Sequence, residues 1–265
     1  MPNSSNRRHF LHKVSLATGA LAVGAADLSP ARAIEPVVRT DGHHFKFSLA
    51  AYSYRNLLSG QNPQLTLVDF VDDCARFGLE GAELTSYYFP ASTDETYCRT
   101  IKAECFRRGL DVSGTAVGND FCHAAGAKRD EAIAHVKTWI DRADWMDAPV
   151  IRIFSGNTKS GQTREEAHRL AVEAIEECCE YAGTKGVFLA LENHGGLTAE
   201  ASGLLALVRD VQSPWFGVNL DTGNFHSSDV YAELEQLAPY ALNVQVKVVV
   251  KPAGGSAQPA DFQRL

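Results

Sequence analysis

The sequence lacks three features that would place it in common functional classes. Its six cysteines form no Cys-x-x-Cys pair, so we expect no thiolate metal site. Its net charge of −7 at pH 7 provides no basic footprint, so we expect no nucleic-acid partner. After residue 33 it has no run of about 20 strongly apolar residues, the length that a transmembrane helix needs. These absences leave an acidic chain with no membrane span in its mature part.

The first 33 residues have the pattern of an export signal. Arg7 and Arg8 precede a mildly apolar run rich in Ala and Gly, which ends at "ARA", residues 31–33. Twin arginines before such a run predict a twin-arginine signal peptide cleaved after Ala33. A membrane anchor is the alternative, but polar residues interrupt the run. We therefore expect an exported, periplasmic or otherwise extracytoplasmic protein whose domain comprises residues 34–265.

Export leaves open whether the cysteines form disulfides or stay free thiols. An oxidising compartment and an even number of cysteines allow disulfides. Proteins exported by the twin-arginine route usually fold in the reducing cytoplasm first, and adjacent Cys178 and Cys179 lie in a helical pattern. Buried free thiols are the favoured interpretation.

From residue 45 onward, short β-rich runs alternate with longer helical patterns. The runs cover residues 45–54, 79–86, 110–118, 149–155, 187–193, 216–221 and 242–250. Between them lie helix start signals. The expected N-caps are Thr163 in a capping box with Glu166, Ser92 or Thr93 for a helix to Arg108, and Thr198 for a helix to Asp210. This alternation predicts a parallel sheet with helical crossovers.

Two parallel architectures compete, the open doubly wound sheet and the closed barrel. The segment "AAYSYRNLLSGQNP" after the first run has no glycine-rich phosphate turn of the kind that a dinucleotide-binding sheet requires. Polar residues concentrate at the carboxyl ends of the runs, where barrel enzymes build their active sites. We therefore predict a (β/α)8 TIM barrel. Only about seven strands are encoded, so the barrel is expected to be truncated, open or completed by something else.

Acids and amides end three successive runs. Alternation places Glu192 and His194 on one side of the fifth run, and Asp221 ends the sixth. A carboxylate that ends a buried strand must be protonated, bound to a cation or paired, for instance with Arg152. Gln245 lies at the equivalent level of the seventh run. Oxygen donors that converge from successive strands suit a divalent cation such as Mn, Mg, Co or Zn.

Three segments carry a specific resemblance. "LALENHGG", "GVNLDTGNF" and "VQVKV" resemble the ends of the fifth, sixth and seventh strands of the xylose isomerase-like barrel superfamily of sugar phosphate isomerases and epimerases. The resemblance covers residues 45 to about 250 and extends to exported members with a twin-arginine leader. It implies that Glu192 is a metal ligand and an acid/base, and that Asp221 and Gln245 complete the metal site, although many members carry His in place of Gln245. The family's eighth-strand Glu, which is the second acid/base in its epimerases, has no counterpart in this sequence.

The resemblance implies a metal-dependent isomerase or epimerase that acts on a sugar or keto-sugar by proton abstraction next to a carbonyl, through an enediolate. Lys247, which shares a strand face with Gln245, is the second candidate catalytic residue. The expected substrate-binding residues are His194, Asn224, Glu83 and Arg152.

Several alternatives stay open. A lyase acting on keto-glycosides would use the same metal and base, and a carbohydrate-binding or vestigial barrel would use neither. A nuclease of the same superfamily would need more His ligands and a basic face. A homo-oligomer is compatible with the sequence.

Overall fold

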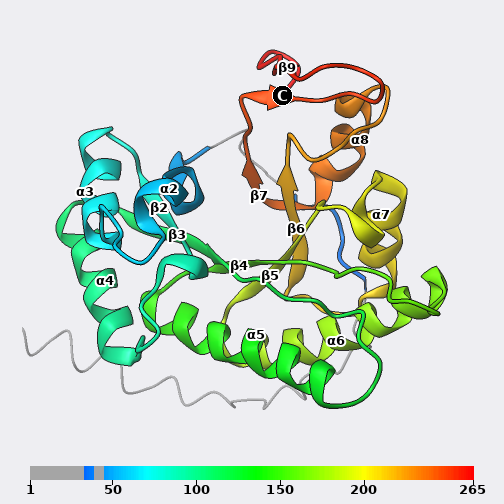
Figure 1. Cartoon of the computed structure of the whole chain (residues 1–265), viewed down its shortest axis with the longest axis horizontal. Helices are drawn as coiled ribbons and strands as arrows, with labels where there is room; N and C mark the ends of the chain where they lie inside the picture. The colour runs from blue at the N-terminus through cyan, green and yellow to red at the C-terminus, as the bar shows by residue number, and fades with distance from the viewer. Residues whose placement is uncertain (1–32, 39–44) are drawn as a thin grey trace, which may run out of the picture. The chain divides into compact units, whose positions relative to one another are not determined.

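The computed structural model describes residues 33–38 and 45–265, which belong to one compact unit (Figure 1). The expected signal peptide lies outside the described residues, apart from Ala33, so it stays a prediction. None of the helices in the described part is long and apolar enough to cross a membrane.

Seven parallel strands form the centre of the fold, and each pairs with the next in chain order. They are β1 (Ser48–Ala50), β2 (Gly81–Thr85), β3 (Asp111–Ala116), β4 (Val150–Ile153), β5 (Phe188–Glu192), β6 (Phe216–Asp221) and β7 (Ala241–Gln245). The sheet curls into a half-barrel, with β1 and β7 as the end strands of the described sheet (Figure 1). The predicted TIM-barrel class with about seven strands is confirmed.

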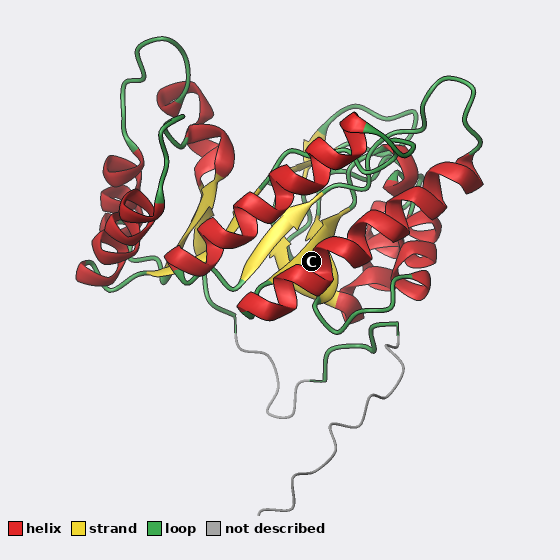
Figure 2. Ribbon diagram, turned by 90° about the horizontal axis from the view of Figure 1, so that it is seen from below, coloured by secondary structure: helices red, strands yellow, loops and turns green. Residues whose placement is uncertain are grey.

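Helices connect the strands and cover the outer face of the sheet (Figure 2). They are α2 (Arg55–Leu58), α3 (Leu67–Arg76), α4 (Glu95–Arg107), α5 (Ala127–Met146), α6 (Arg164–Lys185), α7 (Ala201–Asp210) and α8 (Val230–Leu237). Helix α5 packs between α4 and α6, as expected of consecutive crossovers around a barrel. All six cysteines are buried and unpaired, which confirms the interpretation as free thiols.

The helix starts confirm one of the three expected caps. Thr163 caps α6 through one half of the predicted capping box, because its hydroxyl accepts a hydrogen bond from the backbone N–H of Glu166. The predicted cap of α4 at Ser92 or Thr93 was wrong. Asp94 caps that helix through its carboxylate, while the Thr93 hydroxyl donates to a carbonyl of the preceding turn. Asp is as good a cap as Ser or Thr, so composition alone did not decide between neighbours.

Thr198 does not open α7, which begins at Ala201. It lies instead in a short 3-10 turn that follows β5. Its hydroxyl donates to the carbonyl of Glu192, 3.0 Å away, and accepts from the backbone N–H of His194 at 3.0 Å. Thr198 therefore fixes the turn directly above the end of β5.

The seventh predicted run, residues 242–250, was too long. Strand β7 ends at Gln245, and β8 (Val249–Val250) pairs antiparallel with β9 (Gln258–Pro259) in a separate hairpin. The Thr222 hydroxyl accepts from the backbone N–H of Lys247 at 2.8 Å, which draws the chain across the end of β6 instead of continuing the strand.

Candidate functional site

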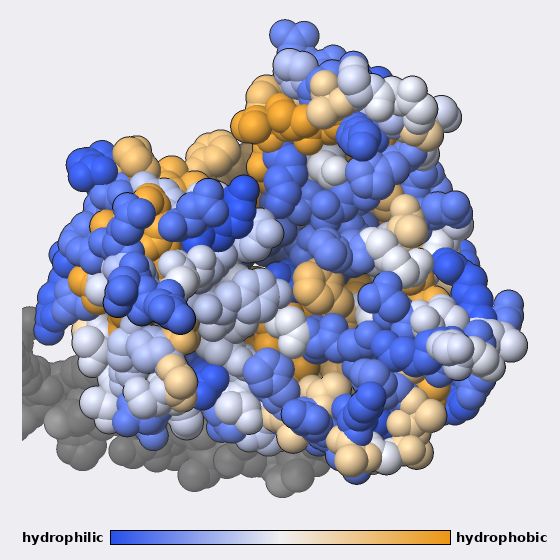
Figure 3. Space-filling model, in the orientation of Figure 1, coloured by the Kyte–Doolittle hydropathy of each residue, from blue (hydrophilic) through white to orange (hydrophobic). Residues whose placement is uncertain are grey.

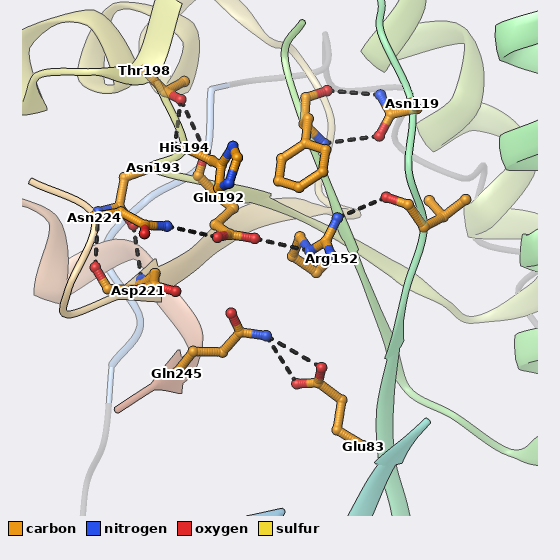
Figure 4. A network of polar contacts seen from close by, with 12 residues as sticks. Glu83, Asn119, Arg152, Glu192, Asn193, His194, Thr198, Asp221, Asn224 and Gln245 are labelled. Carbon is orange, nitrogen blue, oxygen red and sulfur yellow. Dashed lines mark hydrogen bonds and ion pairs between the residues drawn. The ribbon is translucent and has the colours of Figure 1, made fainter. Parts of the chain in front are cut away.

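Five polar side chains from five strands meet at the carboxyl end of the half-barrel (Figure 4). They are Glu83 from β2, Arg152 from β4, Glu192 from β5, Asp221 from β6 and Gln245 from β7. The strand register places Asp221 directly beside Gln245. In the space-filling view, hydrophilic side chains fill the region between α2 and the C-terminal strands (Figure 3). The structure thus brings together the predicted metal ligands and two predicted substrate-binding residues.

Glu192 is 4% exposed and has a partner on each carboxylate oxygen. Its Oε2 lies 2.8 Å from Nε of Arg152, and its Oε1 accepts a hydrogen bond from Nδ2 of Asn224 at 2.8 Å. Burial raises the pKa of Glu192 to about 7; the Arg152 charge opposes this rise, and the Asp221 charge adds to it. A carboxyl group whose pKa lies near neutrality can both accept and return a proton.

Each nitrogen of the Arg152 guanidinium lies close to another group of the protein. Its Nη1 donates to the carbonyl of Val117 at 2.7 Å, and its Nη2 lies 3.4 Å from the hydroxyl of Tyr87. The guanidinium lies 4.0 Å from the centre of the Phe154 ring, which covers it. The Nε–H bond is not aligned for a hydrogen bond with Glu192, so that contact is an ion pair. Arg152 therefore positions and stabilises the Glu192 carboxylate.

Asp221 is 1% exposed, and the protein fixes both its carboxylate and its backbone. Its Oδ1 accepts from the N–H of Gly223 at 2.9 Å. The side-chain amide of Asn193 pairs with the backbone of Asp221 in both directions, at 2.8 and 2.9 Å. This pairing was missed from the sequence, because alternation along β5 points Asn193 away from Glu192.

Lys247 reaches Asp221 from beyond the end of β7. Its Nζ lies 2.8 Å from Oδ2 of Asp221, and its side chain is 42% exposed. A Cβ atom at Gly223 would lie 2.7 Å from Cγ of Lys247, so only glycine leaves room for this approach. The prediction that Lys247 shares a strand face with Gln245 was wrong, but the two residues do belong to one site.

Glu83 faces this cluster from β2. Both of its carboxylate oxygens lie 3.2 Å from Nε2 of Gln245. Burial raises the pKa of Glu83, and the Gln245 hydrogen bond and the Arg152 charge oppose the rise. Because the Gln245 amino group points to Glu83, its oxygen is directed toward the side on which Glu192 and Asp221 lie (Figure 4).

His194 lies above Glu192, at the exposed edge of the site (Figure 4). Its ring packs against Phe154 with 4.6 Å between centroids. Asn119 holds the backbone of Phe154 in both directions, at 2.7 and 2.9 Å, as Asn193 holds Asp221. Neither Asn119 nor Phe154 was predicted as part of the site.

The donor set fits a divalent cation. Glu192, Asp221 and the amide oxygen of Gln245 are hard oxygen donors on three adjacent strands. The cluster combines three buried carboxyl groups (Glu83, Glu192 and Asp221) with two cationic side chains (Arg152 and Lys247). Within the part of the chain that the structure describes, no group of three or more His, Cys, Asp and Glu side chains is placed to hold a metal ion, so a cation at this site would need the Gln245 amide oxygen as well.

The fold and this site define the class of the protein. The family model described as "Xylose isomerase-like TIM barrel" matches residues 71–263, and the chain belongs to this family. The resemblance inferred from the strand ends is thereby confirmed.

Individual relatives are distant. A 3-dehydroshikimate dehydratase from Bacillus anthracis is 23% identical over 205 residues, which cover 76% of this chain and 71% of the relative. The structure of D-psicose 3-epimerase with D-tagatose from Clostridium cellulolyticum H10 superposes with a TM-score of 0.65 at 16% identity, over 76% of this chain and 73% of that one. A xylose isomerase domain protein from Planctomyces limnophilus superposes with a TM-score of 0.59 at 18% identity, over 72% and 74% of the two chains. These structural likenesses establish the fold.

Proposed function

We propose that the protein is a metal-dependent isomerase or epimerase that acts on a sugar or keto-sugar by removing a proton next to a carbonyl group, through an enediolate. The observation that carries this proposal is the position of Glu192, a buried carboxyl group with a pKa of about 7 beside Asp221 and Gln245. A base with a pKa near the working pH is suited to proton transfer from carbon.

Different residues of the chain serve different parts of this proton transfer. The Glu192 carboxylate takes the proton, so the C–H bond breaks, an O–H bond forms, and the electron pair moves onto the former carbonyl oxygen. Asn224 and Arg152 hold the two oxygens of Glu192 in place during this transfer. Lys247 is exposed enough to leave Asp221 and donate a hydrogen bond to the developing oxyanion.

Glu192, Asp221 and Gln245 would hold the divalent cation, and Glu83 would bind a substrate hydroxyl from the opposite side. When bound, the cation polarises the carbonyl group and makes the neighbouring proton more acidic. His194 would contact the substrate from the exposed edge.

A lyase is the second candidate, because the curated relative is a dehydratase. Elimination begins with the same proton abstraction and then expels a group from the next carbon. The same residues serve both reactions, so the fate of the enediolate separates them: proton return gives an isomer or epimer, and loss of a substituent gives an unsaturated product.

Proton exchange tests the common step. The full chain with Mn²⁺ is incubated in D₂O with ketohexoses and keto-glycosides, and deuterium at the carbon next to the carbonyl is followed by NMR. We expect incorporation that Glu192→Gln abolishes and that the exposed control Glu180→Gln leaves unchanged. Absence of exchange with every sugar tested would refute the enzymatic proposal and favour a carbohydrate-binding barrel. Release of an aglycone or of water would show that the protein is a lyase and not an isomerase.

We also propose that residues 1–33 direct export by the twin-arginine route to the periplasm. The support is the Arg7–Arg8 pair and the Ala-x-Ala site at residues 31–33. Replacing both arginines by lysine should retain the protein in the cytoplasmic fraction in its unprocessed length. Export of the double variant at the normal rate would contradict this.

A further inference from the structure

A cavity of about 600 Å³ adjoins the site on the side of β5 and β6. It lies between the turn that follows β5, the loop that follows β6, and the first turns of α8. Its lining includes His194, Glu200, Asn224, His226, Ser227 and Glu233. The proposed reaction needs only the end of this cavity at His194 and Asn224, so most of its volume has no role in proton transfer.

One end of the cavity opens at the catalytic carboxylate. Asn224 lines it and donates to Oε1 of Glu192. His194 lines it as well, and among the described residues no hydrogen bond uses its ring nitrogens. A ligand in this cavity therefore begins at the reacting carbon and extends away from it.

The volume exceeds what one sugar ring needs. A cavity of about 150 Å³ holds one benzene ring. A cavity of 600 Å³ is four times as large, which leaves room for two pyranose rings with their hydroxyl groups.

The middle of the cavity offers hydrogen bonds to hydroxyl groups. Nδ1 of His226 lies 2.9 Å from the carbonyl oxygen of Lys251. A carbonyl only accepts, so Nδ1 carries the proton and Nε2 is left to accept from a ligand. The buried hydroxyl oxygen of Ser227 has no partner among the described residues, and a buried hydroxyl without a partner is costly.

The far end is acidic. Glu200 precedes α7 with its side chain exposed, and Glu233 accepts from the backbone N–H of Ala201 at 2.5 Å, which holds its carboxylate at the start of the same helix. Among the described residues that line the cavity there is no Lys or Arg. Two carboxylates without a cation disfavour an anionic group at this end.

We infer that this cavity is a second carbohydrate subsite, which binds an uncharged sugar ring linked to the ring that reacts at Glu192. The inference rests on the proposed function and narrows its substrate class to keto-glycosides with two rings, as opposed to free monosaccharides, sugar phosphates or glycosides of uronic acids. Affinity comes from the imidazoles of His194 and His226, the Asn224 amide and the Ser227 hydroxyl. Discrimination against anions comes from Glu200 and Glu233.

Calorimetry with unreactive glycosides tests this on the full chain. The probes are methyl glucoside with one ring, maltose and cellobiose with two, and cellobiouronic acid, whose distal ring is a uronic acid. We expect at least one disaccharide to bind ten-fold or more tightly than methyl glucoside, and cellobiouronic acid to bind more weakly than cellobiose. His226→Ala should remove the gain from the second ring and leave methyl glucoside binding unchanged. Glu200→Gln should narrow the gap between cellobiose and cellobiouronic acid, and the exposed control Glu235→Gln should change neither.

Equal affinity for one and two rings, or a gain that survives His226→Ala, would overturn the inference. The result is separable from that of the proposed function. Disaccharide binding without deuterium exchange on any keto-sugar would support the subsite and refute the proposed enzymatic activity. Exchange without a gain from the second ring would support the enzymatic activity and refute the subsite.

Discussion

Arg152 and Glu192 form an ion pair of 2.8 Å between adjacent strands β4 and β5, with both side chains more than nine-tenths buried. Phe154 covers the guanidinium, so water does not screen the pair. Loss of one partner in such a pair leaves a buried charge without compensation, which costs far more than an exposed ion pair contributes.

Arg152→Met should therefore destabilise the protein strongly near neutral pH. We expect the free energy of unfolding to fall by about 3–5 kcal/mol at pH 7.5, the range for a broken buried pair. The loss should shrink at pH 5, where Glu192 is protonated and needs no counter-charge. Urea unfolding at the two pH values measures this, with Arg99→Met in an exposed helical pair as the control. An equal loss at both pH values would mean that packing, and not charge, is the role of Arg152.

The raised pKa of Glu192 links stability to pH. The folded pKa is about 7, and the unfolded value is near 4.3, so the folded state binds the proton more tightly. The contribution is present in full below the unfolded pKa and is lost as the pH rises through 7. At about 1.4 kcal/mol per pKa unit, metal-free protein should lose roughly 3 kcal/mol relative to Glu192→Gln between pH 4 and pH 8. Denaturation in EDTA across this range checks it, and a difference that does not vary with pH would contradict the shifted pKa.

In the proposed site, Lys247 would compete with a cation for Asp221. Its ammonium lies 2.8 Å from Oδ2 of Asp221, and its side chain is partly exposed. Lys247→Met should therefore tighten Mn²⁺ binding by about ten-fold, a change of 1.4 kcal/mol. The same variant should lower the rate of deuterium exchange, because the oxyanion loses a donor. Titration calorimetry gives the affinity, and Lys251→Met is the exposed control. Weaker Mn²⁺ binding in Lys247→Met would show that the lysine supports the metal site and does not compete with it.

Asn193 would support the proposed metal site through the backbone of Asp221 alone. Its amide donates to the carbonyl of Asp221 and accepts from its N–H, and all of these groups are buried. Asn193→Ala would leave both backbone groups without a partner, at about 1–3 kcal/mol each. We expect lower stability in urea together with weaker Mn²⁺ binding. Asn119→Ala is the matched control, since it removes the same pattern beside Phe154; it should cost stability but leave Mn²⁺ affinity unchanged.

These residues show what the sequence could and could not predict. Glu192 and Asp221 were predicted because parallel strands end at one edge and period-two alternation assigns their faces. Asn193 was missed by the same rule, since its contribution is made on the other face. The end of β7 was missed because the pattern of residues 242–250 continues past Gln245, while a hydrogen bond from the Lys247 backbone to Thr222, in the turn after β6, ends the pairing there. Local periodicity carries no information about such a long-range contact.

The cysteines provide a test of the fold that is independent of the site. All six are unpaired and buried, and burial raises the pKa of Cys178 to about 12 and of Cys98 to about 11. Because the thiolate is the reactive form, a thiol reagent at pH 8 should label none of them in the native protein. Six thiols should react after denaturation under non-reducing conditions. Fewer than six would reveal a disulfide, and rapid native labelling would show that the half-barrel opens far enough to expose its interior. Quantification by mass spectrometry of the purified protein distinguishes these outcomes.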